Sequence, residues 1–291
     1  MGNLIDGSFM FYQNTNLSSF ESDTNKLING TKMFYYCTSL SSFDGDLSSL
    51  EDGSYMFYYC KLLPSFSSDM PNLTNGTNMF YYCTSLSSFE KNIPNLEDGK
   101  NMFTRCLALS SFNCDIPNLT NGSNMFNYCT SLSSFKIQDL TNLVEGNRMF
   151  YYCAALSSFE GDLSSLTNGN QMFYYCTALS SFEGDLSSLT SGNYMFNSCS
   201  VLTTFKSDLS SLTAFERYNM FNKCSSIKHF EANLSSLVDH GDIFRYELNK
   251  IETYIGDLSS ITDGYFMFYN CVNLRSFSGD LSSLTSGRYM F

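Results

Sequence analysis

One 23-residue pattern recurs along the whole chain and constrains its fold more than any other feature. The dipeptide Met-Phe marks each repeat, Ile243-Phe244 fills the one gap in the series, and the steps after Met125, Met195 and Ile243 are longer by one, two and one residues. A fixed period of this length is typical of a solenoid, in which each coil packs only on its neighbours. We therefore predict a leucine-rich-repeat-like solenoid of about twelve coils, with one short parallel β-strand per coil and short helical or 3-10 turns.

The same period sets the domain organisation. Although 291 residues could suggest two domains, a repeat array grows by addition, so we expect one elongated domain over 1–291. Its least regular coils lie around 213–255, where extra residues fall. The first and last repeats occupy the same phase of the cycle, and neither has the polar character of a capping repeat, so we expect the solenoid to be part of a longer chain or of an assembly.

Charge excludes two classes of partner. The formal net charge is −12, whereas phosphate contacts need clustered Lys and Arg and anionic membranes attract basic segments. We therefore expect no nucleic-acid partner. No apolar run approaches the length of a membrane span, and the first residues lack the basic and apolar regions of a signal peptide. Membrane insertion is accordingly not expected.

Most cysteines share one column, four residues after each Met. Stacked coils place equivalent residues roughly 4.8 Å apart with parallel side chains, whereas a disulfide needs Cβ atoms that approach and face each other. Zinc ligands must converge tetrahedrally, which a straight column does not allow. We therefore predict a structural column of buried free thiols, represented by Cys153, Cys176 and Cys199, and neither a metal nor another cofactor.

The remaining columns are predicted to have structural roles. The segment Leu40–Gly45 suits the strand, with Leu and Phe facing inward. An Asp or Asn column follows, represented by Asp46, Asp162 and Asp185, and we predict that it caps a short helical turn; calcium is the alternative. The glycine column is predicted to reverse the chain with φ > 0. Met is expected in the core, and the paired tyrosines on the back of the coil, partly exposed.

The pattern that includes Phe173, Cys176, Leu179 and Phe182 resembles the BspA-type leucine-rich repeat of bacterial surface proteins, at the same period and over essentially the whole chain. Gly-Asp stands where that family has Ile-Pro after the strand, and Leu186 and Leu189 arrive two positions early. The resemblance implies an extracellular, cell-surface or virion setting.

Irregular coils on a regular scaffold are where specificity tends to lie. We predict a recognition patch where the repeat changes its exposed residues, although degeneration of the repeats would produce the same departures. Its candidate residues are Phe215, Arg217, Lys228, His229, Arg245 and Tyr246.

Catalysis finds no support in the sequence. The two histidines, His229 and His240, both fall in the irregular zone, and nothing sets a base beside a nucleophile. We therefore predict a non-enzymatic binding or adhesion module, or a rigid spacer, of a surface protein that recognises protein or glycan. The alternative is a structural subunit of a fibre or virion tail fibre, assembled by head-to-tail self-association through open solenoid ends.

Overall fold

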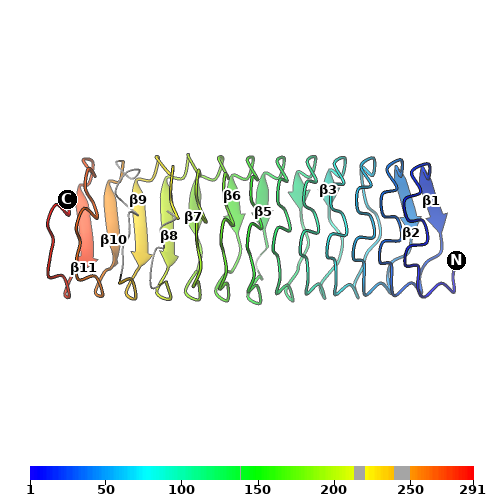
Figure 1. Ribbon diagram of the computed structural model, residues 1–291, viewed down its shortest axis with the longest axis horizontal. Coiled ribbons are helices and arrows are strands. Elements are labelled where there is room, and N and C mark those ends of the chain that lie inside the picture. Colours follow the sequence, from blue (N-terminus) through cyan, green and yellow to red (C-terminus); the bar gives the residue numbers. More distant parts are fainter. Residues whose placement is uncertain (138, 213–219, 239–249) are drawn as a thin grey trace.

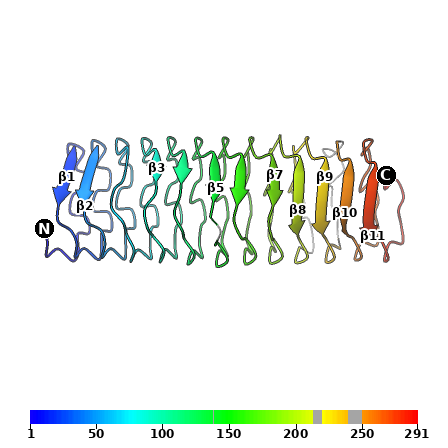
Figure 2. The ribbon, with the colours of Figure 1, turned by 180° about the vertical axis from the view of Figure 1, so that it is seen from behind.

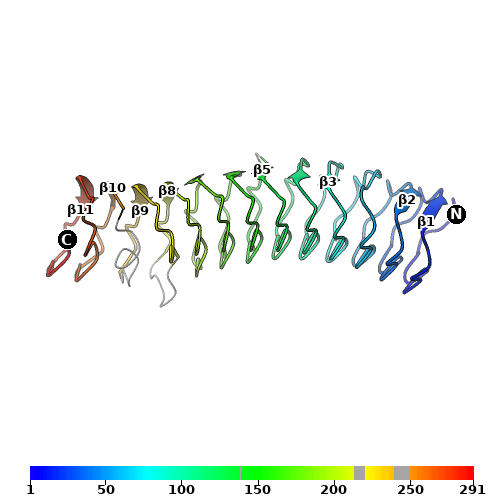
Figure 3. The ribbon, with the colours of Figure 1, turned by 90° about the horizontal axis from the view of Figure 1, so that it is seen from above.

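The computed structural model describes residues 1–137, 139–212, 220–238 and 250–291. The chain winds into an elongated solenoid with its termini at opposite ends (Figure 1), and the view from behind shows the same single row of coils (Figure 2). Seen from above, the strands line one side of the row (Figure 3). The predicted repeat solenoid with parallel strands is confirmed.

The described strands are short, and each comes from a separate coil. They are β1 (Ser19–Ser22), β2 (Ser42–Gly45), β3 (Ser88–Phe89), β4 (Ser111–Phe112), β5 (Ser134–Lys136), β6 (Ser158–Glu160), β7 (Ser181–Glu183), β8 (Thr204–Asp208), β9 (His229–Asn233), β10 (Thr253–Asp257) and β11 (Ser276–Asp280).

All strand pairs are parallel and join equivalent residues of successive coils, so that Phe20 lies opposite Phe43 and Phe205 opposite Phe230. The longest sheet has the order β11-β10-β9-β8-β7. The coil between β2 and β3 has no strand. It carries Pro64, which has no N–H to donate to its neighbour, although its carbonyl still accepts a hydrogen bond from the Ser87 amide at 3.1 Å.

The core is a set of residue columns that run the length of the solenoid. Met79, Phe80, Cys83 and Leu86 of one coil are fully buried, as are their equivalents in the neighbouring coils. Phe80 stacks on Phe103 of the next coil with ring centroids 5.4 Å apart. A second phenylalanine column comes from the strands and meets the first edge-on. Each coil therefore buries its apolar side only against its neighbours. The core extends along the solenoid axis and does not surround a single centre.

A second set of backbone hydrogen bonds joins the coils through the segment around Met-Phe. The amides of Gly30, Lys32, Phe34 and Tyr36 each donate to a carbonyl of the next coil, at 2.8–3.0 Å. Lys32 and Tyr36 have left-handed backbones, with φ of 55° and 59°. They stand at the third position of two β-turns, where a type II turn requires positive φ. This conformation lets alternate amides point along the solenoid axis.

The prediction of positive φ for the glycine column is wrong. No glycine of that column has a left-handed backbone; the residues before Met and before Cys do. The glycine is needed for space instead. A Cβ atom on Gly76 would lie 2.8 Å from Sδ of Met102 and 3.1 Å from Cδ1 of Leu96 in the next coil. Buried side chains of the next coils therefore occupy the space that a side chain at this position would need.

The predicted helical or 3-10 turn is also wrong, since the described residues contain no helix. The amide of Ser48 donates to Oδ1 of Asp46 at 2.8 Å, and the amide of Leu50 to the carbonyl of Leu47 at 3.0 Å, which makes one β-turn. The next two amides, of Glu51 and Asp52, both donate to the carbonyl of Ile28 in the preceding coil. The amides that would extend a helix therefore donate hydrogen bonds to the preceding coil instead.

Candidate functional site

The strand surface consists of the outward residues of the strands, represented by the columns of Ser42 and Asp44. The second column is Asp or Glu in half of the coils and includes two lysines that pair with the next coil. Lys136 lies 2.9 Å from Glu160, and Lys206 lies 2.8 Å from Glu231. These are exposed pairs, which contribute little to stability; they alternate charge along the surface.

The predicted patch is only partly described. Lys228 and His229 are adjacent and exposed at the start of β9. Nζ of Lys228 lies 3.3 Å from Oε1 of Glu252, and Nδ1 of His229 is 2.9 Å from Oγ1 of Thr253. Both side chains therefore contact β10 or the residue before it. The other candidates, Phe215, Arg217, Arg245 and Tyr246, lie outside the described residues.

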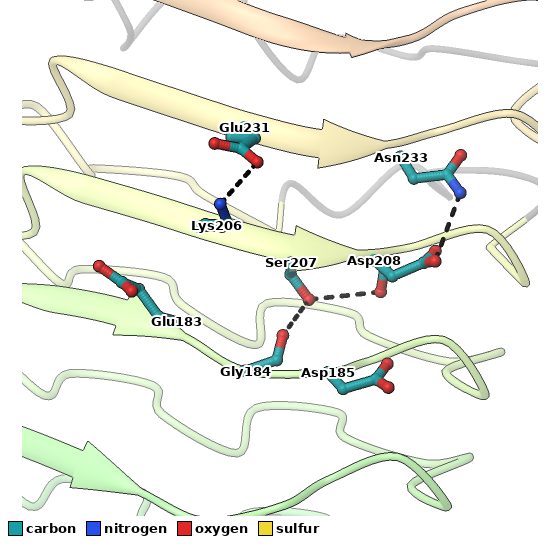
Figure 4. Close-up of a pocket in the computed structure, with 8 residues that line it drawn as sticks. All are labelled: Glu183, Gly184, Asp185, Lys206, Ser207, Asp208, Glu231 and Asn233. Atoms are coloured by element: carbon teal, nitrogen blue, oxygen red, sulfur yellow. Dashed lines mark hydrogen bonds and ion pairs between the residues drawn. The ribbon is translucent and has the colours of Figure 1, made fainter.

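A groove of about 500 Å³ lies on the same side, across β7, β8 and β9 (Figure 4). Its lining contains the carboxylates of Glu183, Asp185, Asp208 and Glu231 and the ammonium of Lys206. The Oγ of Ser207 donates to the carbonyl of Gly184 at 2.7 Å. With four carboxylates and one ammonium, the groove suits a cationic or hydroxyl-rich group.

The sequence prediction missed this groove, although a signal was present. The acidic column changes from Glu183 to Lys206 and back to Glu231, while the small residue after it changes from Gly184 to Ser207. Such a change of charge between successive coils marks a place where the surface differs. The pKa of Lys206 is raised, first by its hydrogen bond to Glu231 and also by the charge of that carboxylate, so the ammonium stays charged.

A second surface, which we call the tyrosine surface, is formed by five residues of each coil: the two before Met, the two after Phe and the one after Cys. In one coil these are Ser54, Tyr55, Tyr58, Tyr59 and Lys61. The paired tyrosines are half-buried in most coils, as predicted. Tyr35 stacks on Tyr58 with centroids 4.8 Å apart, and Tyr36 on Tyr59 at 4.5 Å.

Cations are set among these rings. The guanidinium carbon of Arg105 lies 4.9 Å from the ring centroid of Tyr128 and 5.6 Å from that of Tyr82, so Arg105 continues a stack in which a tyrosine is missing. Nζ of Lys61 lies 4.5 Å from the ring centroid of Tyr59. Such cation–π contacts contribute about 0.5–1 kcal/mol at exposed sites. The side chains of Lys61 and Arg105 therefore lie against the tyrosine rings.

The cysteine thiols, which could otherwise hold a metal or react as nucleophiles, lie in the core of the solenoid. The thiol of Cys60 donates to the carbonyl of Phe34 at 3.2 Å, and burial raises the pKa of Cys37 to about 11, which opposes thiolate chemistry. In the part of the chain that the structure describes, no three His, Cys, Asp or Glu side chains converge as a metal site would require. Over the same residues, no helix has the length and apolarity to cross a bilayer.

Comparison with known families shows to which family the chain belongs. The model of the BspA type leucine-rich repeat region matches residues 6–133, 53–168, 99–228 and 144–275 in overlapping stretches. The chain belongs to the BspA-type leucine-rich repeat family. The resemblance seen in the sequence is therefore confirmed, together with its parallel sheet and solenoid architecture. Membership in this family supports a binding or adhesion-type repeat module, and leucine-rich-repeat solenoids are generally non-enzymatic.

A solved structure shares the fold of this BspA-type chain. A leucine-rich repeat protein of Bacteroides ovatus aligns with a TM-score of 0.54 at 17% identity, over 96% of this chain and 76% of the other. A leucine-rich cell surface protein of Faecalibacterium prausnitzii aligns with a TM-score of 0.48 at 20% identity, over 91% and 79%. No curated protein sequence matches the chain.

Proposed function

We propose that the chain is a non-enzymatic binding or adhesion module of a surface protein and that it recognises a protein or a glycan. The observation that carries this proposal is the change of the strand surface at β8–β10. The outward residue before the buried Phe or Tyr is serine from β1 to β7, and it becomes Thr204, His229 and Thr253 in these three strands. The acidic groove lies beside this change. Membership in the BspA-type family supports the same function and the surface setting.

The test is binding of the purified chain to an array of immobilised glycans and to a panel of purified extracellular-matrix proteins. The double substitution Lys228→Ser and His229→Ser is expected to weaken binding to the protein or glycan that is recognised. Lys136→Ser is the control, because Lys136 makes the same kind of exposed ion pair with the next coil but lies outside β8–β10. Lack of binding to every component would contradict the proposal, and unchanged binding by the double variant would exclude this surface.

The fibre alternative predicts self-association through the ends of the solenoid. Sedimentation velocity at micromolar concentration distinguishes it from the binding module. Species that grow with concentration would support a fibre subunit, whereas a monodisperse monomer would exclude assembly through these ends.

A further inference from the structure

The tyrosine surface differs in charge from the rest of the molecule. Over residues 8–200, its five positions per coil contain no Asp or Glu in any coil, although the whole chain carries a formal net charge of −12. Five cations occupy these positions: Lys32, Lys61, Lys100, Arg105 and Arg148. Among the described residues, none of the five forms an ion pair with a carboxylate within 4.0 Å; the described pairs lie in or beside the strands.

Cations of the tyrosine surface contact aromatic rings, whereas the lysines of the strand surface pair with carboxylates. Nζ of Lys32 lies between Phe9 and Tyr55, 5.2 and 5.3 Å from their ring centroids, and the guanidinium of Arg148 lies 5.6 Å from Tyr151. The nearest carboxylates along the chain stand in the two columns before each glycine, as Glu51 and Asp52 do. There Asp52 and Asp98 accept the amides two residues later, at 2.8 Å. The five cations are therefore available to an anionic partner.

The stacked rings favour an anion as well. Where successive coils both have the tyrosine pair, the rings stack face to face, as Tyr58 does on Tyr81 at 4.7 Å and 6°, so the ring faces are covered and the edges point outward. The edge of an aromatic ring carries the positive end of its quadrupole. Burial, with smaller contributions from neighbouring tyrosines, raises the pKa of Tyr58 to about 12. The phenol hydroxyls therefore stay protonated and can donate hydrogen bonds.

The spacing of the cations distinguishes between anionic polymers. Lys32 and Arg148 are five coils apart, which is about 24 Å at the spacing of parallel strands. Duplex DNA of that length carries about fourteen phosphates, far more than five cations can match. The intervening positions are rich in neutral hydrogen-bonding groups, including Thr77, Asn101, Ser123 and Asn124. Such groups suit sugar hydroxyls between widely spaced acidic groups.

We propose that the tyrosine surface over residues 31–152 binds an extended acidic polysaccharide, whose carboxylates meet the five cations and whose hydroxyls meet the neutral side chains and phenols. This inference rests on the proposed binding function and names the class of ligand and the surface that takes it. The ligand lies along the solenoid axis, because the rows of rings, amides and cations all run in that direction.

The repeat itself supplies substitutions that preserve the fold. Lys61→Thr, Lys100→Ser and Arg105→Tyr each introduce a residue that other coils already have at the same position, as Thr38, Ser54 and Tyr82 show. The matched control removes three cations elsewhere, by Lys26→Ser, Lys91→Ser and Lys136→Asn. The two triple variants have the same net charge, so a difference between them reports the surface and not the overall charge.

Binding to immobilised polygalacturonate is measured at 50 and 150 mM salt by biolayer interferometry. We expect the tyrosine-surface variant to bind at least about tenfold more weakly, a difference of about 1.4 kcal/mol, and to lose part of the salt dependence. The control variant is expected to bind as the natural chain does. Fully methyl-esterified polygalacturonate, which keeps the sugars and loses the charges, is expected not to bind.

Three outcomes would overturn the inference: equal loss in both variants, equal binding of the esterified polymer, or binding of polyglutamate or oligo-dT as tight as that of polygalacturonate. Failure of this inference is distinguishable from failure of the proposed function. If the chain binds another array component and that binding depends on Lys228 and His229, the module stands and only the tyrosine-surface ligand is wrong.

Discussion

At the scale of single residues, the Asp162 carboxylate accepts the amide of Ser164 at 2.8 Å, and Asp185 accepts that of Ser187 at the same distance. The aspartate column is thus a row of local hydrogen-bond acceptors, except in the three coils where Pro71, Pro94 or Pro117 stands two residues later and has no N–H. An amide oxygen can accept the same bond, and Asn233 does so for Ser235 at 3.1 Å.

We therefore expect Asp162→Asn to leave stability nearly unchanged, whereas Asp162→Ala should lower the free energy of unfolding by about 1 kcal/mol, the usual net contribution of a hydrogen bond. Guanidinium titration of both variants measures this difference, and a chelator should not shift the melting temperature of the natural chain. Equal losses from Asn and Ala would show that the charge, and not the acceptor, is needed.

The glycine column depends on the neighbouring coil. Gly76→Ala should lower the free energy of unfolding by about 1–3 kcal/mol, the usual cost of overpacking, because the new Cβ would lie 2.8 Å from the buried Sδ of Met102. Gly287→Ala is the control. It belongs to the same column, but its Cβ would meet only Cδ2 of Leu284, at 3.5 Å.

Thermal or guanidinium unfolding compares the two glycine variants. Gly287→Ala should be neutral or slightly stabilising, since alanine restricts the unfolded chain. Equal destabilisation at both positions would mean that the glycines are needed for their backbone conformation and not for space.

At the scale of the element, periodicity predicted the strands well because one buried Phe per coil sets their register. It failed for the segments between them. A turn preceded by Asp looks helical in sequence, yet Glu51 and Asp52 direct their amides to the preceding coil. The left-handed residues were missed for a similar reason, since Tyr36 and Lys32 are not residues that sequence rules associate with positive φ.

Aromatic residues of adjacent coils stack along the core. The ring of Phe103 lies between those of Phe80 and Phe126, with centroids 5.4 and 5.6 Å away, and meets Phe89 edge-on at 4.9 Å. Phe103→Leu should lower the free energy of unfolding by about 2 kcal/mol, since each aromatic pair contributes about 0.5–1.5 kcal/mol beyond its buried area.

Phe9→Leu is the matched control for Phe103→Leu, because Phe9 is 52% exposed and its loss should cost under about 0.5 kcal/mol. Urea titration measures both variants. A cost at Phe103 as small as that at Phe9 would show that the stacks add nothing to apolar burial.

At the scale of the whole molecule, the cysteine column makes stability depend on pH. Burial raises the pKa of Cys37 and Cys271 to about 11, and the thiols of the interior coils, such as Cys83 and Cys106, are raised further. The folded state therefore keeps thiol protons that the unfolded chain loses near pH 9. Their contribution is complete below that pH and is lost as the pH rises through the folded values.

Each such thiol should lower the free energy of unfolding by about 1.4 kcal/mol per pH unit above pH 9. Guanidinium midpoints between pH 8 and 10.5 should therefore fall steeply. In the variant with Cys83→Ala and Cys106→Ala, the slope should decrease by about two protons. An unchanged slope in this variant would mean that other groups, such as the tyrosines, cause the alkaline loss.

The sequence by itself determined the period, the parallel strands, the buried Met, Phe, Cys and Leu columns and the partly exposed tyrosine pairs, because a side chain that recurs every 23 residues must meet its own copies when coils stack. Only the tertiary structure decided how the coils touch. The space that Gly76 leaves for Met102, the left-handed turns and the cations held between rings are relations between neighbouring coils. They depend on distances between residues about 23 positions apart, which local sequence rules do not describe.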